Sequence, residues 1–60
     1  MQGQDSVKVT NEALETHGEV GRVVCAGPFD VDGVPHVDVV LDLDDTRAVR
    51  EFAVADLMVL

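Results

Sequence analysis

The sequence contains no tryptophan and no tyrosine, and its only phenylalanines are Phe29 and Phe52. A groove that docks proline-rich peptides and a cage that holds methylated lysine both need several aromatic side chains. A platform that stacks the bases of a single nucleic-acid strand needs them as well. The scarcity of aromatic residues therefore excludes these three kinds of site.

Cysteine and lysine each occur once, as Cys25 and Lys8. A single thiol cannot form an internal disulfide, and no Cys/His ligand set for a structural metal is present, so a cytoplasmic location is expected. The 12 acidic residues outnumber the 4 basic ones, which gives a formal net charge of -8. Nucleic-acid binding depends on basic groups that displace phosphate counterions, so DNA and RNA are not expected partners. The acidity is also consistent with simple solubility or with adaptation to a salt-rich host.

Long apolar runs are missing too. No stretch approaches the roughly 18 residues that cross a membrane, and residues 1–6 lack the basic and apolar regions of a secretion signal, so no membrane association is expected. A chain of 60 residues forms one domain with a small core, and domains of this size usually need a disulfide, a metal or a partner chain. Because the first two have no support in the sequence, a partner protein or self-association is expected.

Valine is abundant, with thirteen copies in the chain. Its branched side chain is stiff and suits a pleated sheet, so we expect an all-β fold. Period-two alternation and the Gly, Pro and Asp punctuation predict five short strands, at residues 6–10, 18–27, 36–43, 47–54 and 58–60. Residues 1–5 are expected to form a polar tail and residues 6–60 a single domain. The segment 11–18 fits either one or two helical turns or an irregular loop pinned by Leu14, and a tight turn is expected at residues 55–57.

The strongest local signal is Asp32-Gly33 between Val31 and Val34. Both central residues of a two-residue hairpin turn need positive φ, which Asp-Gly tolerates well. Pairing back from this turn sets Val31 opposite Val34. An unbroken ladder would then set Cys25 opposite Val40 and would also set Val23 opposite Asp42.

The arrangement as a whole resembles the SH3-like barrels, in particular the KOW-like variety. The residues that carry the resemblance are Val7-Lys8-Val9, Gly18-x-x-Gly21-x-Val23-Val24, and Ala55-Asp56-Leu57 before the last strand. It covers residues 6–60 and implies a small five-stranded barrel. Members of the KOW-like variety bind RNA, ribosome or polymerase partners, so the resemblance implies an accessory of the translation or transcription apparatus.

Alternation along residues 36–43 separates a core face from an outer face. We expect Val37, Val39, Leu41 and Leu43 in the core. His36, Asp38, Val40 and Asp42 then face outward. With the unbroken ladder, Val23 and Cys25 join Val40 in a small external apolar patch.

Strand 47–54 presents two alternatives. If Phe52 packs inward, strict alternation sends Arg50 and Ala48 inward and Val49 outward, where it extends the patch, and Arg50 reaches solvent at the barrel mouth. A bulge would instead bury Val49 and free Arg50. Across the hairpin, Arg47 is expected to face Asp42 or Asp44. The predicted interface therefore comprises the apolar residues Val23, Cys25, Val40 and Val49 and the rim residues Asp38, Asp42, Arg47 and Arg50.

No residue set predicts a metal, a cofactor or catalysis. An EF-hand register over Asp30-Val31-Asp32-Gly33 would place Pro28 and Val39 where acidic ligands are required. Acidic residues at 42, 44 and 45 suit a solvated turn. The spacing of His17, His36 and Cys25 matches no nucleophile–base motif, and so small a barrel leaves little room for a substrate pocket, so neither an enzyme nor a small-molecule substrate is expected.

Three functions remain. The first is a protein–protein interaction module or assembly subunit that docks through an outer sheet face. The second is an acidic inhibitor that mimics nucleic acid and occupies the basic cleft of a DNA- or RNA-handling enzyme, as some small phage proteins do. The third is the KOW-like accessory implied by the resemblance. Salt separates the first two, because an electrostatic complex weakens steeply with ionic strength and apolar docking persists.

Overall fold

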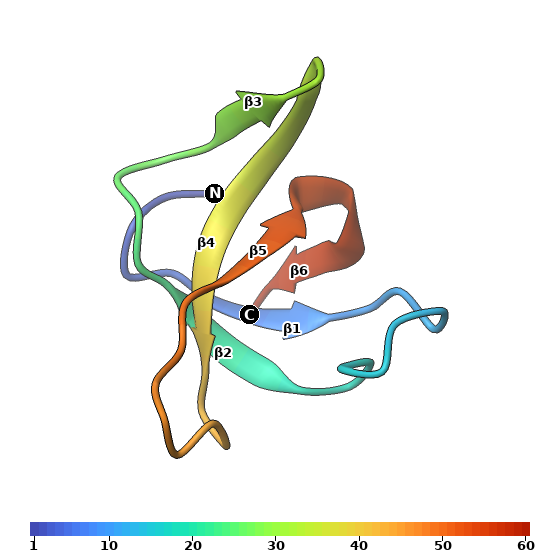
Figure 1. Cartoon of the computed structure of the whole chain (residues 1–60), viewed down its shortest axis with the longest axis vertical. Coiled ribbons are helices and arrows are strands. Elements are labelled where there is room, and N and C mark those ends of the chain that lie inside the picture. The colour runs from blue at the N-terminus through green and yellow to red at the C-terminus, as the bar shows by residue number, and fades with distance from the viewer.

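The computed structural model describes all 60 residues and shows one antiparallel sheet that curls into a half-barrel (Figure 1). The elements in chain order are β1 (Ser6–Val9), β2 (Val20–Val23), β3 (Phe29–Val31), β4 (Val34–Leu41), β5 (Arg50–Ala53), the 3-10 turn η1 (Val54–Asp56) and β6 (Leu57–Val59). The all-β class is confirmed. The chain forms six strands where five were expected, because the second expected strand ends early, at Val23, and residues 29–31 form a strand of their own, β3.

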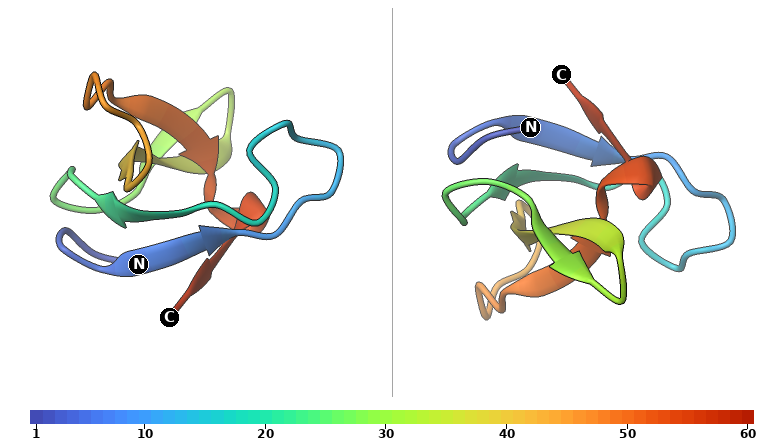
Figure 2. Two further views of the ribbon diagram at one scale, coloured as in Figure 1. Left: turned by 90° about the horizontal axis from the view of Figure 1, so that it is seen from below. Right: turned by 90° about the horizontal axis from the view of Figure 1, so that it is seen from above.

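Strand β4 is the centre of the sheet. The order of pairing is β3-β4-β2-β1-β6, and β5 pairs with β4 outside this path. Strands β2 and β3 therefore share one side of β4, and β5 lies along the other. Figure 2 shows the resulting curl, in which β1 and β2 form one wall and β4 and β5 face them. Since β6 pairs only with β1 and β5 only with β4, the sheet remains open between β5 and β6.

The Asp-Gly hairpin turn forms as expected. Asp32 and Gly33 have φ values of 50° and 80°, and Val31 lies directly opposite Val34. These left-handed angles match the right-handed twist of the flanking strands. The prediction at this turn is confirmed.

The ladder beyond the hairpin does not continue unbroken. Val23 lies opposite Val39, three positions away from the expected partner Asp42. Because side chains alternate along a strand, an odd slip exchanges the two faces. Val23 therefore points into the core, where it is 0% exposed, and its expected position on an external patch is wrong.

The interruption between β2 and β3 is held by the thiol of Cys25. The backbone amide of Asp38 donates to Cys25 Sγ at 3.4 Å, and the thiol donates to the carbonyl of Gly27 at 3.2 Å. The amide of Val24 donates to the carbonyl of Asp38 at 2.9 Å. The sulfur thus accepts a hydrogen bond from the Asp38 amide, which has no backbone carbonyl partner on this side of β4. In this way the sheet accommodates the residues between β2 and β3 without leaving that amide unpaired.

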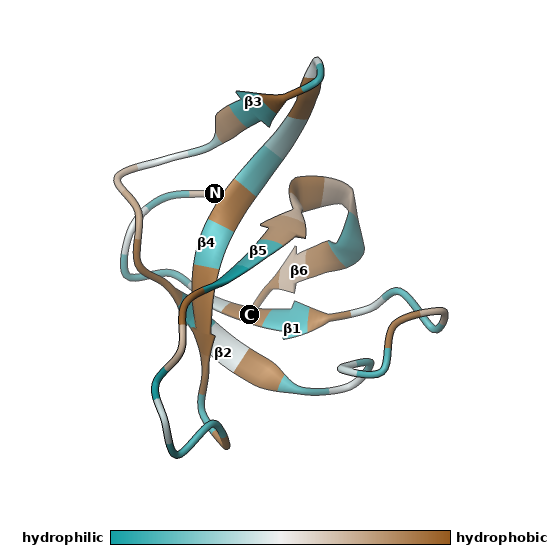
Figure 3. Cartoon of the chain, viewed as in Figure 1, coloured by the Kyte–Doolittle hydropathy of each residue, from teal (hydrophilic) through white to brown (hydrophobic).

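Eight apolar side chains form the core, and Figure 3 shows the alternation of apolar and polar residues along β4. They are Val7, Val9, Val23, Val37, Val39, Leu41, Phe52 and Leu57. Leu43 was expected among them but is 81% exposed. The chain turns directly after β4, since the amide of Asp44 donates to the carbonyl of Leu41 at 3.1 Å, and this turn directs Leu43 into solvent.

The loop between β1 and β2 is a series of turns without a helix, so the irregular alternative is the correct one. Leu14 packs against the core, and the amide of Gly18 donates to the carbonyl of Val9 at 2.8 Å. Asn11 Nδ2 donates to Asp56 Oδ1 at 3.0 Å, which ties the loop to η1. The chain's helical turn is η1 itself, at the expected tight turn before the last strand.

The first five residues, expected as a polar tail, lie along β2. The amide of Gln4 donates to the carbonyl of Val23, the amide of Val23 donates to the carbonyl of Asp5, both at 2.9 Å, and Met1 packs against the core. No helix in the chain is long and apolar enough to cross a membrane.

Candidate functional site

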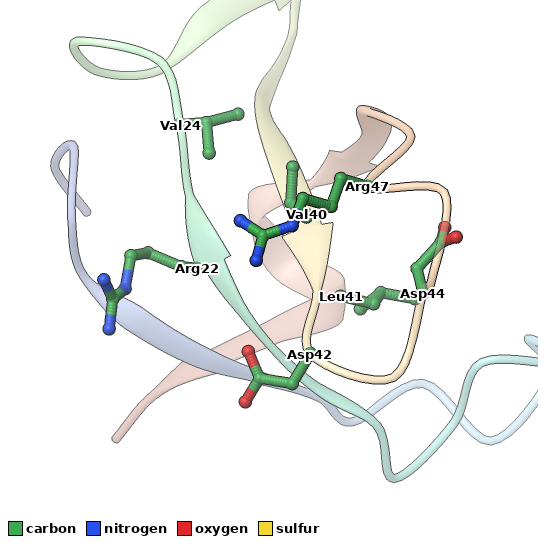
Figure 4. Close-up of a pocket in the computed structure, with 7 residues that line it drawn as sticks. All are labelled: Arg22, Val24, Val40, Leu41, Asp42, Asp44 and Arg47. Atoms are coloured by element: carbon green, nitrogen blue, oxygen red, sulfur yellow. The ribbon is translucent and has the colours of Figure 1, made fainter.

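The outer face of the sheet carries one open surface hollow of about 440 Å³ (Figure 4). Its lining residues are Arg22, Val24, Val40, Leu41, Asp42, Asp44 and Arg47. They come from β2 and the residue that follows it, from the end of β4 and from the loop that leaves β4. The hollow combines an apolar floor with two arginines and two aspartates.

Strand pairing builds the floor of the hollow. Arg22 lies directly opposite Val40 on neighbouring strands, and their flanking partners Val23 and Val39 are completely buried. Alternation therefore sends Arg22 and Val40 to the outer face together. Val24 follows on the same wall and is 46% exposed.

The loop after β4 forms the other wall. The amide of Arg47 donates to the carbonyl of Asp44 at 3.0 Å, and Arg47 has a left-handed φ of 52°. Figure 4 shows the Arg47 side chain reaching back from this loop over the sheet, toward Val40. The backbone turn thus brings a cation to the apolar floor.

Asp44 anchors this loop. Its carboxylate accepts hydrogen bonds from the Thr46 hydroxyl at 2.7 Å, from the Thr46 amide at 3.2 Å and from Arg50 Nε at 3.3 Å. The hydrogen bond from the Thr46 hydroxyl is the main cause that lowers the pKa of Asp44; desolvation, the next largest effect, opposes it, and the Thr46 amide and Arg50 lower the pKa further. Because all three donors favour the charged form, Asp44 stays ionised and holds the loop in shape.

The only ion pair in the chain joins Arg50 to Asp44. The expected pairing of Arg47 with Asp42 or Asp44 is therefore wrong, since Arg50 takes Asp44 and Arg47 is left without a carboxylate partner. Arg22 has no carboxylate partner either. The hollow thus carries two unpaired guanidinium groups.

The start of β5 follows strict alternation without a bulge. Arg50 lies opposite Val39 in an unbroken register that continues to Phe52 opposite Val37. Phe52 is buried, Arg50 is exposed at the end of the sheet, and Val49 is 60% exposed. Of the two alternatives, the one with Arg50 reaching solvent at the sheet end is correct.

The predicted interface residues are thus distributed over three places. Val40, Asp42 and Arg47 meet at the hollow, Val23 is in the core, and Cys25 is half-buried in the β2–β3 interruption. Of the others, Asp38 is half-buried on β4, opposite Glu51, and Val49 and Arg50 are exposed at the start of β5.

Sequence reasoning missed Arg22 and Val24 as members of the site. The register slip brings Val24 to the surface in place of its neighbour Val23. The signal that could have found this change is Gly27-Pro28, since proline cannot donate to a ladder and marks a break in a strand.

The remaining candidate residues are the histidines and the acidic side chains. No group of three or more His, Cys, Asp or Glu side chains is placed to hold a metal ion. The ring of His36 stacks on Phe29 with centroids 6.5 Å apart, and His36 Nδ1 lies 2.8 Å from the carbonyl oxygen of Val34. Both rings are thus engaged in local packing of the β3–β4 hairpin.

No protein family model, curated protein or solved structure matches this chain.

Proposed function

We propose that this protein is a protein–protein interaction module with an SH3-like connectivity, which docks a partner through the hollow on its outer sheet face. The observation that carries the proposal is the apolar floor of Val24 and Val40 beside Arg22 and Arg47, two arginines without an ion-pair partner. Apolar area at the centre of a surface site supplies binding energy, and arginine is enriched at protein interfaces.

The order of elements supports the SH3-like part of the proposal. A long first loop joins β1 to β2, η1 precedes the last strand, and β6 returns to pair with β1. These features correspond to the resemblance seen in the sequence. A fold of this kind says little about function. The docking role is therefore supported by the residues of the hollow and not by the fold.

The charges of the hollow favour a protein segment over a nucleic acid. Asp42 and Asp44 lie beside the two arginines, and the whole chain carries a net charge of -8. A phosphate backbone would meet Asp42 and Asp44 beside the arginines, and the net negative charge of the chain would repel it. The best partner for the hollow is a segment with a branched aliphatic side chain for the floor and a neighbouring carboxylate for the guanidinium groups.

The proposal is tested by affinity capture from a lysate of the source cell with three immobilised proteins: wild type, Val40→Glu and Val34→Glu. Val34 is the matched control, since it is an exposed valine on the same strand at the far end from the hollow. We expect a partner that wild type and Val34→Glu retain in high salt and that Val40→Glu loses. Equal capture by Val40→Glu would refute docking through the hollow.

An acidic mimic of nucleic acid is the second candidate. The observation that favours it is the position of Asp38 directly opposite Glu51 on neighbouring strands, with no cation paired to either. Like charges in this arrangement destabilise a sheet, and here they concentrate negative charge on one part of the surface. This candidate predicts a basic nucleic-acid enzyme in the captured fraction, released by a moderate increase in salt and unaffected by Val40→Glu.

A further inference from the structure

Leu43 is the most exposed large apolar side chain of the molecule, at 81%. It lies in the first turn of the loop that leaves β4, between Asp42 and Asp44, with Asp45 next after Asp44 in the sequence. Exposed leucine flanked by carboxylates is the chemistry that the hollow accepts under the proposed function. The loop and the hollow are therefore complementary surfaces carried by the same chain.

We infer that the occupant of the hollow is a second copy of this chain, which inserts Leu43 over the apolar floor and brings Asp42 and Asp45 to Arg22 and Arg47. This inference rests on the proposed function and names its partner. Charge complementarity supports it, because the two arginines have no ion-pair partner in their own chain and the side chains of Asp42 and Asp45 have none either.

The location of the loop permits a symmetric contact. Asp42 and Asp44 line the hollow and also flank Leu43, so each copy carries its leucine beside its own hollow. Two copies related by a two-fold axis can then exchange leucines, and every contact occurs twice. A closed dimer of this kind leaves no free hollow to propagate a fibre.

The loop is already held in the conformation that presents Leu43. Asp44 accepts three hydrogen bonds from Thr46 and Arg50, and the amides of Asp44 and Arg47 close two successive turns. A segment that is ordered before it binds loses less conformational entropy on association. This order favours docking by the loop over docking by a flexible tail.

The size of the contact sets the concentration at which it is observed. A specific interface needs at least about 1,000 Å² in total, or about 500 Å² from each copy. That is roughly an eighth of the 3944 Å² surface of the chain. An interface at this lower limit is weak, so we expect dimers to form in the micromolar to millimolar range.

Sedimentation equilibrium of the full chain tests the inference, with protein from about 10 µM to about 1 mM. An ionic strength of about 0.15 M screens the repulsion between two acidic copies beyond about 8 Å. We expect a monomer–dimer equilibrium for wild type and for the control Val34→Ser. Leu43→Ser should raise the dissociation constant at least about tenfold, because each dimer loses two buried leucines.

A charge-swap pair gives the sharper test. One variant carries Arg22→Glu and Arg47→Glu, and the other carries Asp42→Arg and Asp45→Arg; all four residues are exposed and none makes a side-chain hydrogen bond. Each variant alone should be monomeric, since every cross-copy contact is repulsive. The equimolar mixture should form a heterodimer, since both sets of contacts become attractive again.

A wild-type chain that remains monomeric up to the highest concentration overturns the inference, and so does a mixture of the two charge-swap variants that stays monomeric. Unchanged dimerisation of Leu43→Ser overturns it as well. These results differ from a failure of the proposed function, which would appear as equal capture of a different protein by wild type and Val40→Glu.

Discussion

At Gly21 on β2, the curled sheet is packed too closely to accept a side chain. A Cβ added there would lie 2.6 Å from the carbonyl oxygen of Val40, 2.8 Å from Cγ1 of Val39 and 3.1 Å from Cα of Leu41. Two of these atoms belong to the backbone of β4, and the third belongs to a side chain that is 0% exposed. None of them can move aside without displacing the strand pair, so Gly21→Ala should destabilise the fold.

The magnitude follows from two opposing effects. Overpacking of a well-packed core costs about 1–3 kcal/mol, and the reduced freedom of the unfolded chain on replacing Gly by Ala returns about 0.4–1 kcal/mol. The free energy of unfolding should fall by about 1–2 kcal/mol. For a domain of this size, that corresponds to a decrease of roughly 5–15 °C in Tm.

The assay is thermal and urea unfolding followed by far-ultraviolet circular dichroism, because the chain has no tryptophan or tyrosine for fluorescence. Gly27→Ala is the matched control, since an added Cβ at Gly27 would meet no atom within 4 Å. We expect the control to be neutral or slightly stabilising. A Gly21→Ala variant as stable as wild type would refute the close approach of β2 and β4 at Gly21.

Three further predictions concern the register, the thiol and the loop anchor. Val23→Ala should lower the free energy of unfolding by about 2 kcal/mol, because Val23 is buried, and Val24→Ala should lower it by less than about 0.5 kcal/mol, because Val24 is exposed. The reverse order in urea unfolding would contradict the observed register. Cys25→Ala should lower the free energy of unfolding by about 1 kcal/mol. Cys25→Ser should lower it by less, because serine keeps a donor and an acceptor for the same backbone groups. Equal values for the two variants in urea unfolding would argue against the hydrogen bonds of the Cys25 thiol. Thr46→Val should raise the pKa of Asp44 toward its ordinary 3.8 in an NMR titration of the carboxyl carbon. Since the folded-state pKa lies below that value, the stabilisation from Asp44 is complete at neutral pH and is lost as the pH falls through the lowered pKa.

The hairpin and the inner face of β4 could be predicted from the sequence because local rules decide them. Asp32-Gly33 tolerates positive φ at both residues, and Val37, Val39 and Leu41 alternate with period two. These signals depend only on neighbours in the chain.

The register of β2 could not be predicted in the same way. It depends on how many residues leave the ladder before β3, and those residues are held by a tertiary contact of the Cys25 thiol with the Asp38 amide of β4 and by a local one with the carbonyl of Gly27. Because side chains alternate, the slip exchanged Val23 and Val24 between core and surface. The candidate site consequently gained Val24 and Arg22 and lost Val23.

The prediction for the loop after β4 was wrong for a related reason. Continuing the alternation beyond Leu41 predicted a buried Leu43, but the strand ends there in a turn. Competition between Arg47 and Arg50 for Asp44 was decided by the geometry of two successive turns, which residue spacing alone does not specify. Both unexpected results are also the basis of the proposed self-association.

Docking through the hollow is tested by an NMR chemical-shift map of the labelled chain with its bound partner. We expect the largest shifts at Arg22, Val24 and residues 40–47, at the concentrations where binding occurs. Shifts confined to the free edge of β6, with the amides of the hollow unchanged, would contradict it.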